Sequence, residues 1–104
     1  MAAAVAAGNL DAPLARLYPG ESRRSRRGRV LRLLGRHRDL FGPGEVRLVS
    51  APGRAELGCN HTDHNGGRVL AAAVDLDLLA AARAAGDGTA EIVSRGFPRI
   101  IRVD

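Results

Sequence analysis

Gly42-Pro43-Gly44 divides this 104-residue chain into a helical first part and a strand-rich second part. Upstream of it, Val30, Leu33 and Leu34 share the i, i+3, i+4 spacing of one helix face. This spacing predicts a helix over residues 24–40. The helix must end at the Gly-Pro-Gly sequence, because glycine is conformationally permissive and proline removes a backbone donor. The order of the two parts predicts an α+β fold, in which a helix is followed by antiparallel strands.

Polar and apolar residues alternate at period two in the second part, which is typical of strands buried on one face. Residues 45–50 (EVRLVS) form the first predicted strand, which Ala51-Pro52-Gly53 ends or bends. We expect further strands over residues 74–84, 89–94 and 97–103. The first two of these flank Gly86-Asp87-Gly88, a hairpin turn sequence, so we expect them to pair with each other. The Ala and Leu content before this turn favours a helix by propensity, but a hairpin needs a strand there.

Residues 1–22 are predicted to form a disordered or irregular N-terminal arm, because their start is rich in alanine and Pro19-Gly20 marks a turn. The predicted folded part is therefore residues 23–104. The single cysteine, Cys59, excludes an intramolecular disulfide and agrees with a cytoplasmic location. No apolar stretch approaches the ~18 residues of a membrane span, so we expect no membrane partner.

All 16 basic residues are arginines, and the formal charge is +5. Clustered arginines neutralise phosphates, so the run ESRRSRRGR (21–29) is a candidate nucleic-acid interface. This run contains no aromatic residue that could stack on bases, and arginine is used throughout the chain, so we favour a solvated helix start. We likewise expect His37 to be a solvated helix residue, and Asp75 and Asp77 to be strand-surface groups.

Residues 51–67 (APGRAELGCNHTDHNGG) gather most of the chain's candidate functional side chains. Asp63 could accept hydrogen bonds from vicinal hydroxyls, which Asn60 and His61 could complement, and Arg54 could face phosphate oxygens. A polar turn with satisfied side chains is the plain alternative. A zinc site is a third, less favoured alternative, since its possible ligands are closely spaced: Cys59, His61, Asp63 and His64. A Cys59 nucleophile lacks a third residue to orient its base.

The motifs APGR, HTD and NGG, in this order directly after a strand, resemble the N-terminal signature of galactokinases, which belong to the GHMP superfamily of small-molecule kinases. The family pattern Ala-Pro-Gly-Arg-Val-Asn-Leu-Ile-Gly-Glu-His-Thr-Asp-Tyr-Asn-Gly-Gly aligns with residues 51–67 without a gap. Residues 69–94 are also similar to the family's sugar-site strand pair. The resemblance implies the N-terminal portion of a GHMP kinase fold (ribosomal protein S5 domain 2-like), with residues 54–67 lining a sugar pocket.

The resemblance also implies roles for single residues. Arg54 matches an arginine that stabilises the transition state of phosphoryl transfer. Sugar hydroxyls would be bound by the following residues: Asn60, His61, Thr62 and Asp63. The family transfers the γ-phosphoryl group of ATP, with Mg²⁺, to the anomeric hydroxyl of galactose or a related sugar. Nothing in residues 68–104 matches the family's Gly/Ser-rich phosphate loop, so the resemblance implies that this chain alone is inactive. A non-catalytic sugar-binding module is the alternative.

The chain departs from the family pattern at several positions. Glu56 stands where the family has Asn, and Asn60 where it has Glu, a pairing that resembles divergent, galactokinase-like branches. Asn60 keeps an acceptor oxygen but lacks the charge that strengthens a hydrogen bond from a hydroxyl. Gly58-Cys59 and His64 replace Ile-Gly and Tyr. The implied ligand is therefore galactose or a related sugar.

Overall fold

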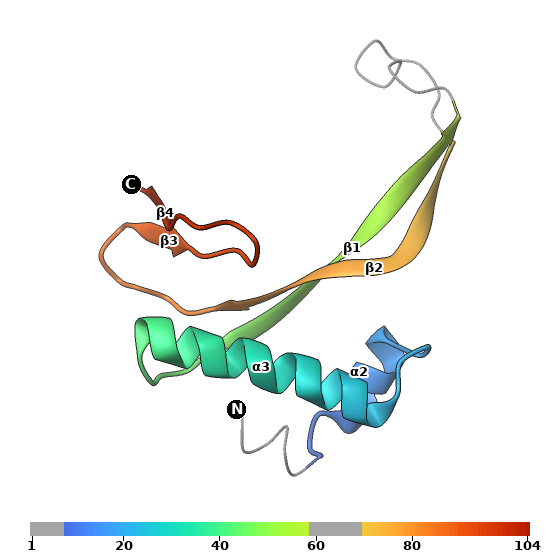
Figure 1. Ribbon diagram of the computed structural model, residues 1–104, viewed down its shortest axis with the longest axis horizontal. Helices are drawn as coiled ribbons and strands as arrows, with labels where there is room; N and C mark the ends of the chain where they lie inside the picture. The colour runs from blue at the N-terminus through green and yellow to red at the C-terminus, as the bar shows by residue number, and fades with distance from the viewer. Residues whose placement is uncertain (1–7, 59–69) are drawn as a thin grey trace.

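The structure is a computed structural model, and it describes residues 8–58 and 70–104. Within these residues, two helices precede four strands, which pair as two separate antiparallel sheets of two strands each. The elements are α2 (Asp11–Leu17), α3 (Arg23–Phe41), β1 (Arg47–Gly58), β2 (Leu70–Ala82), β3 (Ala90–Ile92) and β4 (Ile101–Val103). In Figure 1, β1 and β2 form a long arm that projects away from the helices, while β3 and β4 lie beside its other end. The predicted mixture of helix and antiparallel strands is confirmed.

α3 begins and ends where its flanking residues satisfy the free backbone groups of a helix. The Ser22 side chain accepts a hydrogen bond from the Ser25 amide at 3.1 Å and so caps the first turn. At the other end, Gly42 has φ +79°, and its amide donates to the Arg38 carbonyl at 2.8 Å. The predicted helix over residues 24–40 is therefore confirmed, within one residue at each end.

The expectation of an irregular arm is wrong for α2. Leu14 and Tyr18 lie one helical turn apart and are buried, and they form the core with Val30 and Leu34 of α3. Asp11 fixes the start of α2 through two hydrogen bonds from the Arg27 guanidinium, at 2.7 and 2.6 Å. Packing against α3 thus orders a helix too short to be stable by itself. Residues 1–7, also part of the predicted arm, lie outside the described residues.

β1 continues beyond the point where we expected a strand to end. Pro52 and Gly53 lie inside it, and the strand runs to Gly58. Pro52 is tolerated because β1 has only one partner among the described strands. A proline in a strand with partners on both sides would interrupt a ladder of backbone hydrogen bonds, and β1 is not such a strand. At Gly53 the strands approach closely: a Cβ there would lie 3.1 Å from Val74 Cγ2 and 3.2 Å from the Leu76 carbonyl oxygen. The bend expected at Ala51-Pro52-Gly53 takes the form of a register shift.

The predicted strand over residues 74–84 is confirmed as part of β2, but its predicted partner is wrong. β2 pairs with β1, and β3 pairs with β4. β1 is 12 residues long and can pair along most of the 13 residues of β2, whereas β3 is only three residues long. Gly86 and Gly88, both with φ near +80°, turn the chain as expected, but the segment that follows is too short to compete for β2.

The inner face of the arm packs on the helices only near its base. Leu48 of β1 and Leu79 and Ala81 of β2 lie against the core. Arg83, just after β2, donates to the carbonyls of Phe41 and Pro43 and so holds the end of α3 to the end of the strand. Within residues 8–58 and 70–104, no helix is long and apolar enough to cross a membrane.

Candidate functional site

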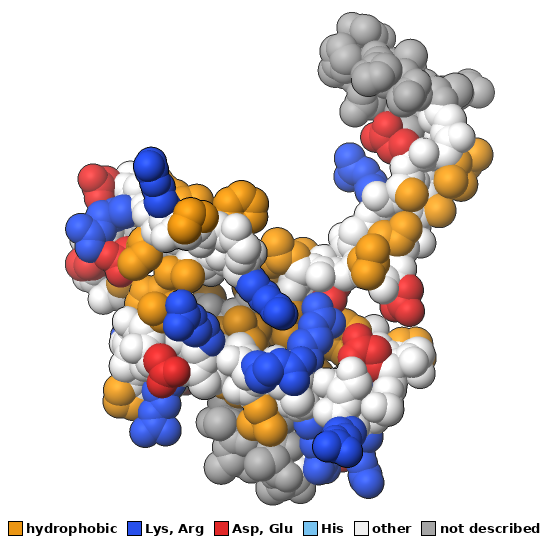
Figure 2. All heavy atoms as spheres, in the orientation of Figure 1, with side chains coloured by type: hydrophobic (Ala, Val, Ile, Leu, Met, Phe, Trp, Pro, Cys, Tyr) orange, Lys and Arg blue, Asp and Glu red, His pale blue; other side chains and the backbone are white. Residues whose placement is uncertain are grey.

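Arg54 is the only residue of the predicted site that lies within the described part of the chain. It is exposed on β1 and pairs with Ala73, and Glu56 follows at the next position on the same face, paired with Ala71. The alanines opposite are small and exposed, so they leave this face of the arm open. Figure 2 shows basic and acidic side chains on the arm. A guanidinium and a carboxylate, two residues apart, can together contact a ligand that carries phosphate oxygens and hydroxyls.

The remaining predicted sugar-binding residues, Asn60, His61, Thr62 and Asp63, lie outside the described residues, as do Cys59 and His64. The segment 59–69 that contains them joins the ends of β1 and β2, and Gly58 and Leu70 are the last described pair. The arm therefore leads directly into this segment. Within the described ranges, no group of three or more His, Cys, Asp or Glu side chains could hold a metal ion. The zinc alternative is not tested by this observation.

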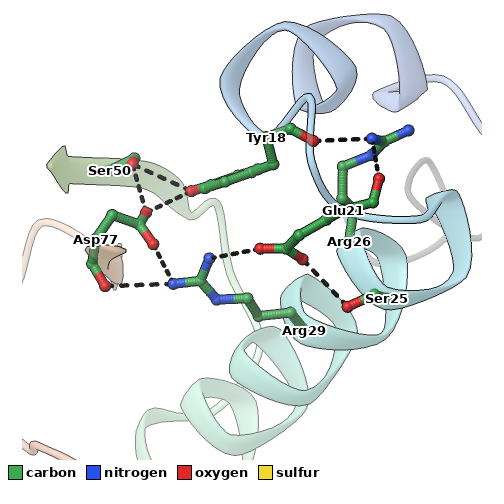
Figure 3. Close-up of polar contacts among 7 residues, drawn as sticks. All are labelled: Tyr18, Glu21, Ser25, Arg26, Arg29, Ser50 and Asp77. Atoms are coloured by element: carbon green, nitrogen blue, oxygen red, sulfur yellow. Dashed lines mark hydrogen bonds and ion pairs between the residues drawn. The ribbon is translucent and has the colours of Figure 1, made fainter. Parts of the chain in front are cut away.

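A buried carboxylate, missed in the sequence, lies at the base of the arm. The side chain of Asp77 is only 9% exposed. Its Oδ2 accepts hydrogen bonds from the Tyr18 and Ser50 hydroxyls, both at 2.6 Å, and its Oδ1 pairs with the Arg29 guanidinium. Figure 3 shows that this network joins α3, the turn after α2 and both strands of the arm. The expectation that Asp77 is a surface group is wrong.

The network keeps Asp77 ionised. Burial alone raises the pKa of this carboxyl, but hydrogen bonds from Ser50, Tyr18 and Arg29 outweigh burial and hold the pKa below its usual range. Burial, together with the hydrogen bond to Asp77, raises the pKa of the Tyr18 hydroxyl. Arg29 also lies over the Tyr18 ring, 5.1 Å from its centroid. The group is a satisfied structural network, and Asp77 lies opposite Pro52, two residues before Arg54.

One sequence signal could have identified Asp77. It shares a strand face with Leu79 and Ala81, which pack against the core, so alternation places its carboxylate on the inner side of β2. A charged residue at such a position requires partners. Asp75, by contrast, is exposed, as expected of a strand-surface group.

The arginine-rich start of α3 is less solvated than expected. Arg26 donates to the Tyr18 carbonyl at 2.9 Å, Arg27 binds Asp11, and Arg29 binds Asp77. These three arginines hold α2, the turn after it and the base of the arm to α3, whereas Arg24 is exposed. The nucleic-acid hypothesis stays a prediction. The expectation for His37 is wrong: it is buried, and its ring packs on that of Phe41 at 5.0 Å between centroids.

Comparison with known proteins shows what the arm is similar to. Residues 35–84 match the family model of the galactokinase galactose-binding signature. The matched residues contain the end of α3 and all of β1 and β2, so they include Arg54, Asp77 and the segment between the strands. This part of the chain carries the galactose-binding signature of galactokinases. No solved structure matches the chain.

Individual galactokinases show the same similarity. The chain is 35% identical to the galactokinase of Enterococcus faecalis over 68 residues, which are 65% of this chain and 18% of that protein. It is 40% identical over 68 residues to the galactokinase of Streptococcus suis, and 36% identical over 66 residues to that of Lacticaseibacillus casei. In both comparisons the match covers 64% of this chain and 17% of the relative. The chain thus spans less than a fifth of the length of these galactokinases.

Proposed function

We propose that this chain contributes the sugar-binding part of a galactokinase-like sugar kinase, with galactose or a related sugar as its ligand. The observation that carries the proposal is the signature match over residues 35–84, which coincides with the arm and its junction with α3. The open face beside Arg54 and Glu56 supports it, because sugar hydroxyls and a phosphoryl group need such polar partners. The fold we propose is the N-terminal portion of a GHMP kinase domain.

The proposed reaction is transfer of the γ-phosphoryl group of ATP to the anomeric hydroxyl of the sugar. Arg54 would stabilise negative charge that develops on the phosphoryl oxygens. Asn60, His61, Thr62 and Asp63 would hold the sugar hydroxyls. We propose a cytoplasmic location, as expected from the sequence.

The described residues do not fit a nucleotide and its Mg²⁺. They contain no cluster of metal-binding side chains, and no glycine-rich loop leads into a helix after β2. Two hollows on the surface of the described residues lie at the start of α3 and beside Arg47 and Arg83, and neither is lined by Arg54. We therefore propose that the nucleotide is bound outside the described residues, and we expect the isolated chain not to catalyse the transfer.

Calorimetric titration of the full chain with galactose tests sugar binding. We expect saturable binding that Asp63→Ala abolishes and that Arg54→Ala leaves nearly unchanged, because the arginine acts on the phosphoryl group. Asp87→Ala is the matched control, since it removes an exposed carboxylate from the turn after β2. Binding that survives Asp63→Ala would contradict the proposed site.

A second assay tests the expectation of inactivity. Incubation of the chain with ATP, Mg²⁺ and galactose should give no sugar phosphate. If it gives robust turnover that Arg54→Ala removes, the chain holds a nucleotide site that the sequence does not reveal, and the proposal of a sugar-binding part alone fails.

A further inference from the structure

The pairing of the two strands of the arm shifts register at Gly53, and again between Glu56 and Gly58. From Arg47↔Ala82 to Pro52↔Asp77 the pairing is regular, and it resumes at Arg54↔Ala73. Between these last two pairs β1 advances by two residues and β2 by four, so β2 carries two residues more than β1 at this point. In Figure 1, β2 bends along the arm. The excess in β2 therefore helps to set the direction in which the Arg54 end leaves the helices.

Asp77 belongs to the last regular pair before this shift. Its carboxylate accepts from Ser50 of β1 and Tyr18 beside α2, and it pairs with Arg29 of α3. These contacts hold one residue of β2 to both the neighbouring strand and the helices. The contacts of Asp77 therefore place the register shift immediately before Arg54.

The sequence of β2 offers an alternative register. Val74-Asp75-Leu76-Asp77-Leu78 repeats its pattern every two residues, so a two-residue slide would bring Asp75 opposite Pro52 and remove the excess. Such a slide keeps each side chain on its own face, so the hydrophobic pattern alone does not forbid it. It corresponds to about 7 Å of movement along the strand.

The slide is opposed by the charge of Asp77 itself. It would carry Asp77 to the position of Leu79, which packs against Leu14, Tyr18, Val30 and Leu34. A carboxylate there would be partly buried against apolar side chains, with Ser50 opposite it but without Arg29, its charged partner in the observed register, which is costly. Arg83 also supports the observed register, because it binds the Phe41 and Pro43 carbonyls. Its contribution is smaller than that of Asp77, because Arg83 is exposed to solvent.

We propose that Asp77 is a positioning residue, which sets the β1–β2 register and thereby the place of Arg54. It acts in two ways: it binds Arg29, Ser50 and Tyr18 in the observed register, and it is excluded from the apolar position of Leu79 in the other. The link to sugar binding rests on the proposed function, whereas the register itself does not.

Disulfide cross-linking reads the register directly. In a Cys59→Ser background, Ala51→Cys/Leu78→Cys reports the observed pairing, because directly paired residues lie within disulfide reach. Ala51→Cys/Leu76→Cys reports the slid pairing, and residues two positions out of register lie beyond that reach. We expect only the first pair to cross-link when Asp77 is present.

Asp77→Leu should invert this pattern, because Asp75 can then occupy the network and a leucine can occupy the position of Leu79. We expect the ratio of the two cross-linked products to change about tenfold or more. Asp75→Leu makes the same change two residues away and should leave the ratio unchanged. Asp77→Asn, which keeps the side-chain volume, should move the ratio in the same direction by less. An unchanged ratio in Asp77→Asn, or in soluble Asp77→Leu, would overturn the proposal.

Galactose titration of the same variants separates this proposal from the proposed function. Asp77→Leu should weaken galactose binding about tenfold, or about 1.4 kcal/mol, because the slide redirects the whole outer end of the arm and not Arg54 alone; Asp75→Leu should not weaken it. If the cross-links shift but the unsubstituted chain binds no galactose, the proposed function fails and the role of Asp77 in the register stands. If galactose binds but the cross-links do not shift, the positioning proposal fails alone.

Discussion

The base and the outer end of the arm are made of the same two strands but are stabilised in opposite ways. At the base, Leu48 and Leu79 pack against a core in which Val30 is 1% exposed, and Asp77 is fully hydrogen-bonded. Beyond Gly53, Leu57 and Leu70 are 65% and 63% exposed. Figure 2 shows hydrophobic side chains along the surface of the arm. The base is therefore organised by packing, whereas the outer end leaves Arg54 and its neighbours exposed.

Removal of core volume should produce the largest difference between the two regions. We expect Leu34→Ala to lower the free energy of unfolding by about 2–5 kcal/mol, because Leu34 is buried between the helices. Leu57→Ala, the matched change on the outer end, should cost less than about 0.5 kcal/mol. Urea denaturation followed by circular dichroism measures both. Equal losses would show that the outer end is packed as well as the base.

Removal of the buried carboxylate should have the next largest effect. The pKa of Asp77 is held below its ordinary value of 3.8, so its contribution to stability is present above that pH and is lost as pH falls through the folded-state pKa. Asp77→Asn should lower the free energy of unfolding by about 1–3 kcal/mol at pH 7. It should also remove the loss of stability that protonation of Asp77 causes at low pH. Asp75→Asn is the control. If the two variants have the same acid profile, the network does not stabilise the base.

Loss of a single hydroxyl from the network should have a smaller effect. Tyr18→Phe keeps the buried ring but removes the donor to Asp77, and we expect it to lower stability by about 1 kcal/mol. Galactose affinity should change little, because Ser50 and Arg29 still hold Asp77. A loss of affinity larger than the loss of stability would mean that Tyr18 acts on the outer end more directly.

The smallest change should have the opposite sign. A Cβ at Gly35 meets no atom within 4 Å, so Gly35→Ala should stabilise α3 by about 0.5–1 kcal/mol. Gly42→Ala should destabilise it, because Gly42 has φ +79°. Thermal unfolding measures both variants. If Gly35→Ala destabilises the protein, the exposed face of α3 has a packing role that the structure does not show.

The sequence predicted those elements whose formation depends on residues close together in the chain. α3 follows from its apolar spacing and the Gly-Pro-Gly stop, and β2 from its alternation. The pairing of β2 does not follow from local patterns, because the choice between β1 and β3 depends on partner length and packing. α2 was missed because Leu14 and Tyr18 become ordered only against Val30 and Leu34.

The candidate site was predictable only in part. The resemblance identified the signature and Arg54 from contiguous residues. The Asp77 network was not predicted, since its members come from four separate segments: Tyr18, Arg29, Ser50 and Asp77. Only the three-dimensional structure brings them together.

The most direct test of the division between base and outer end is a map of amide chemical shifts during galactose titration of the full, ¹⁵N-labelled chain. We expect saturable shifts in the outer part of the arm, at Arg54, Glu56 and the β2 residues opposite them, and nearly none along α2 and α3. Saturable shifts concentrated on α3, with the outer end unaffected, would contradict the account.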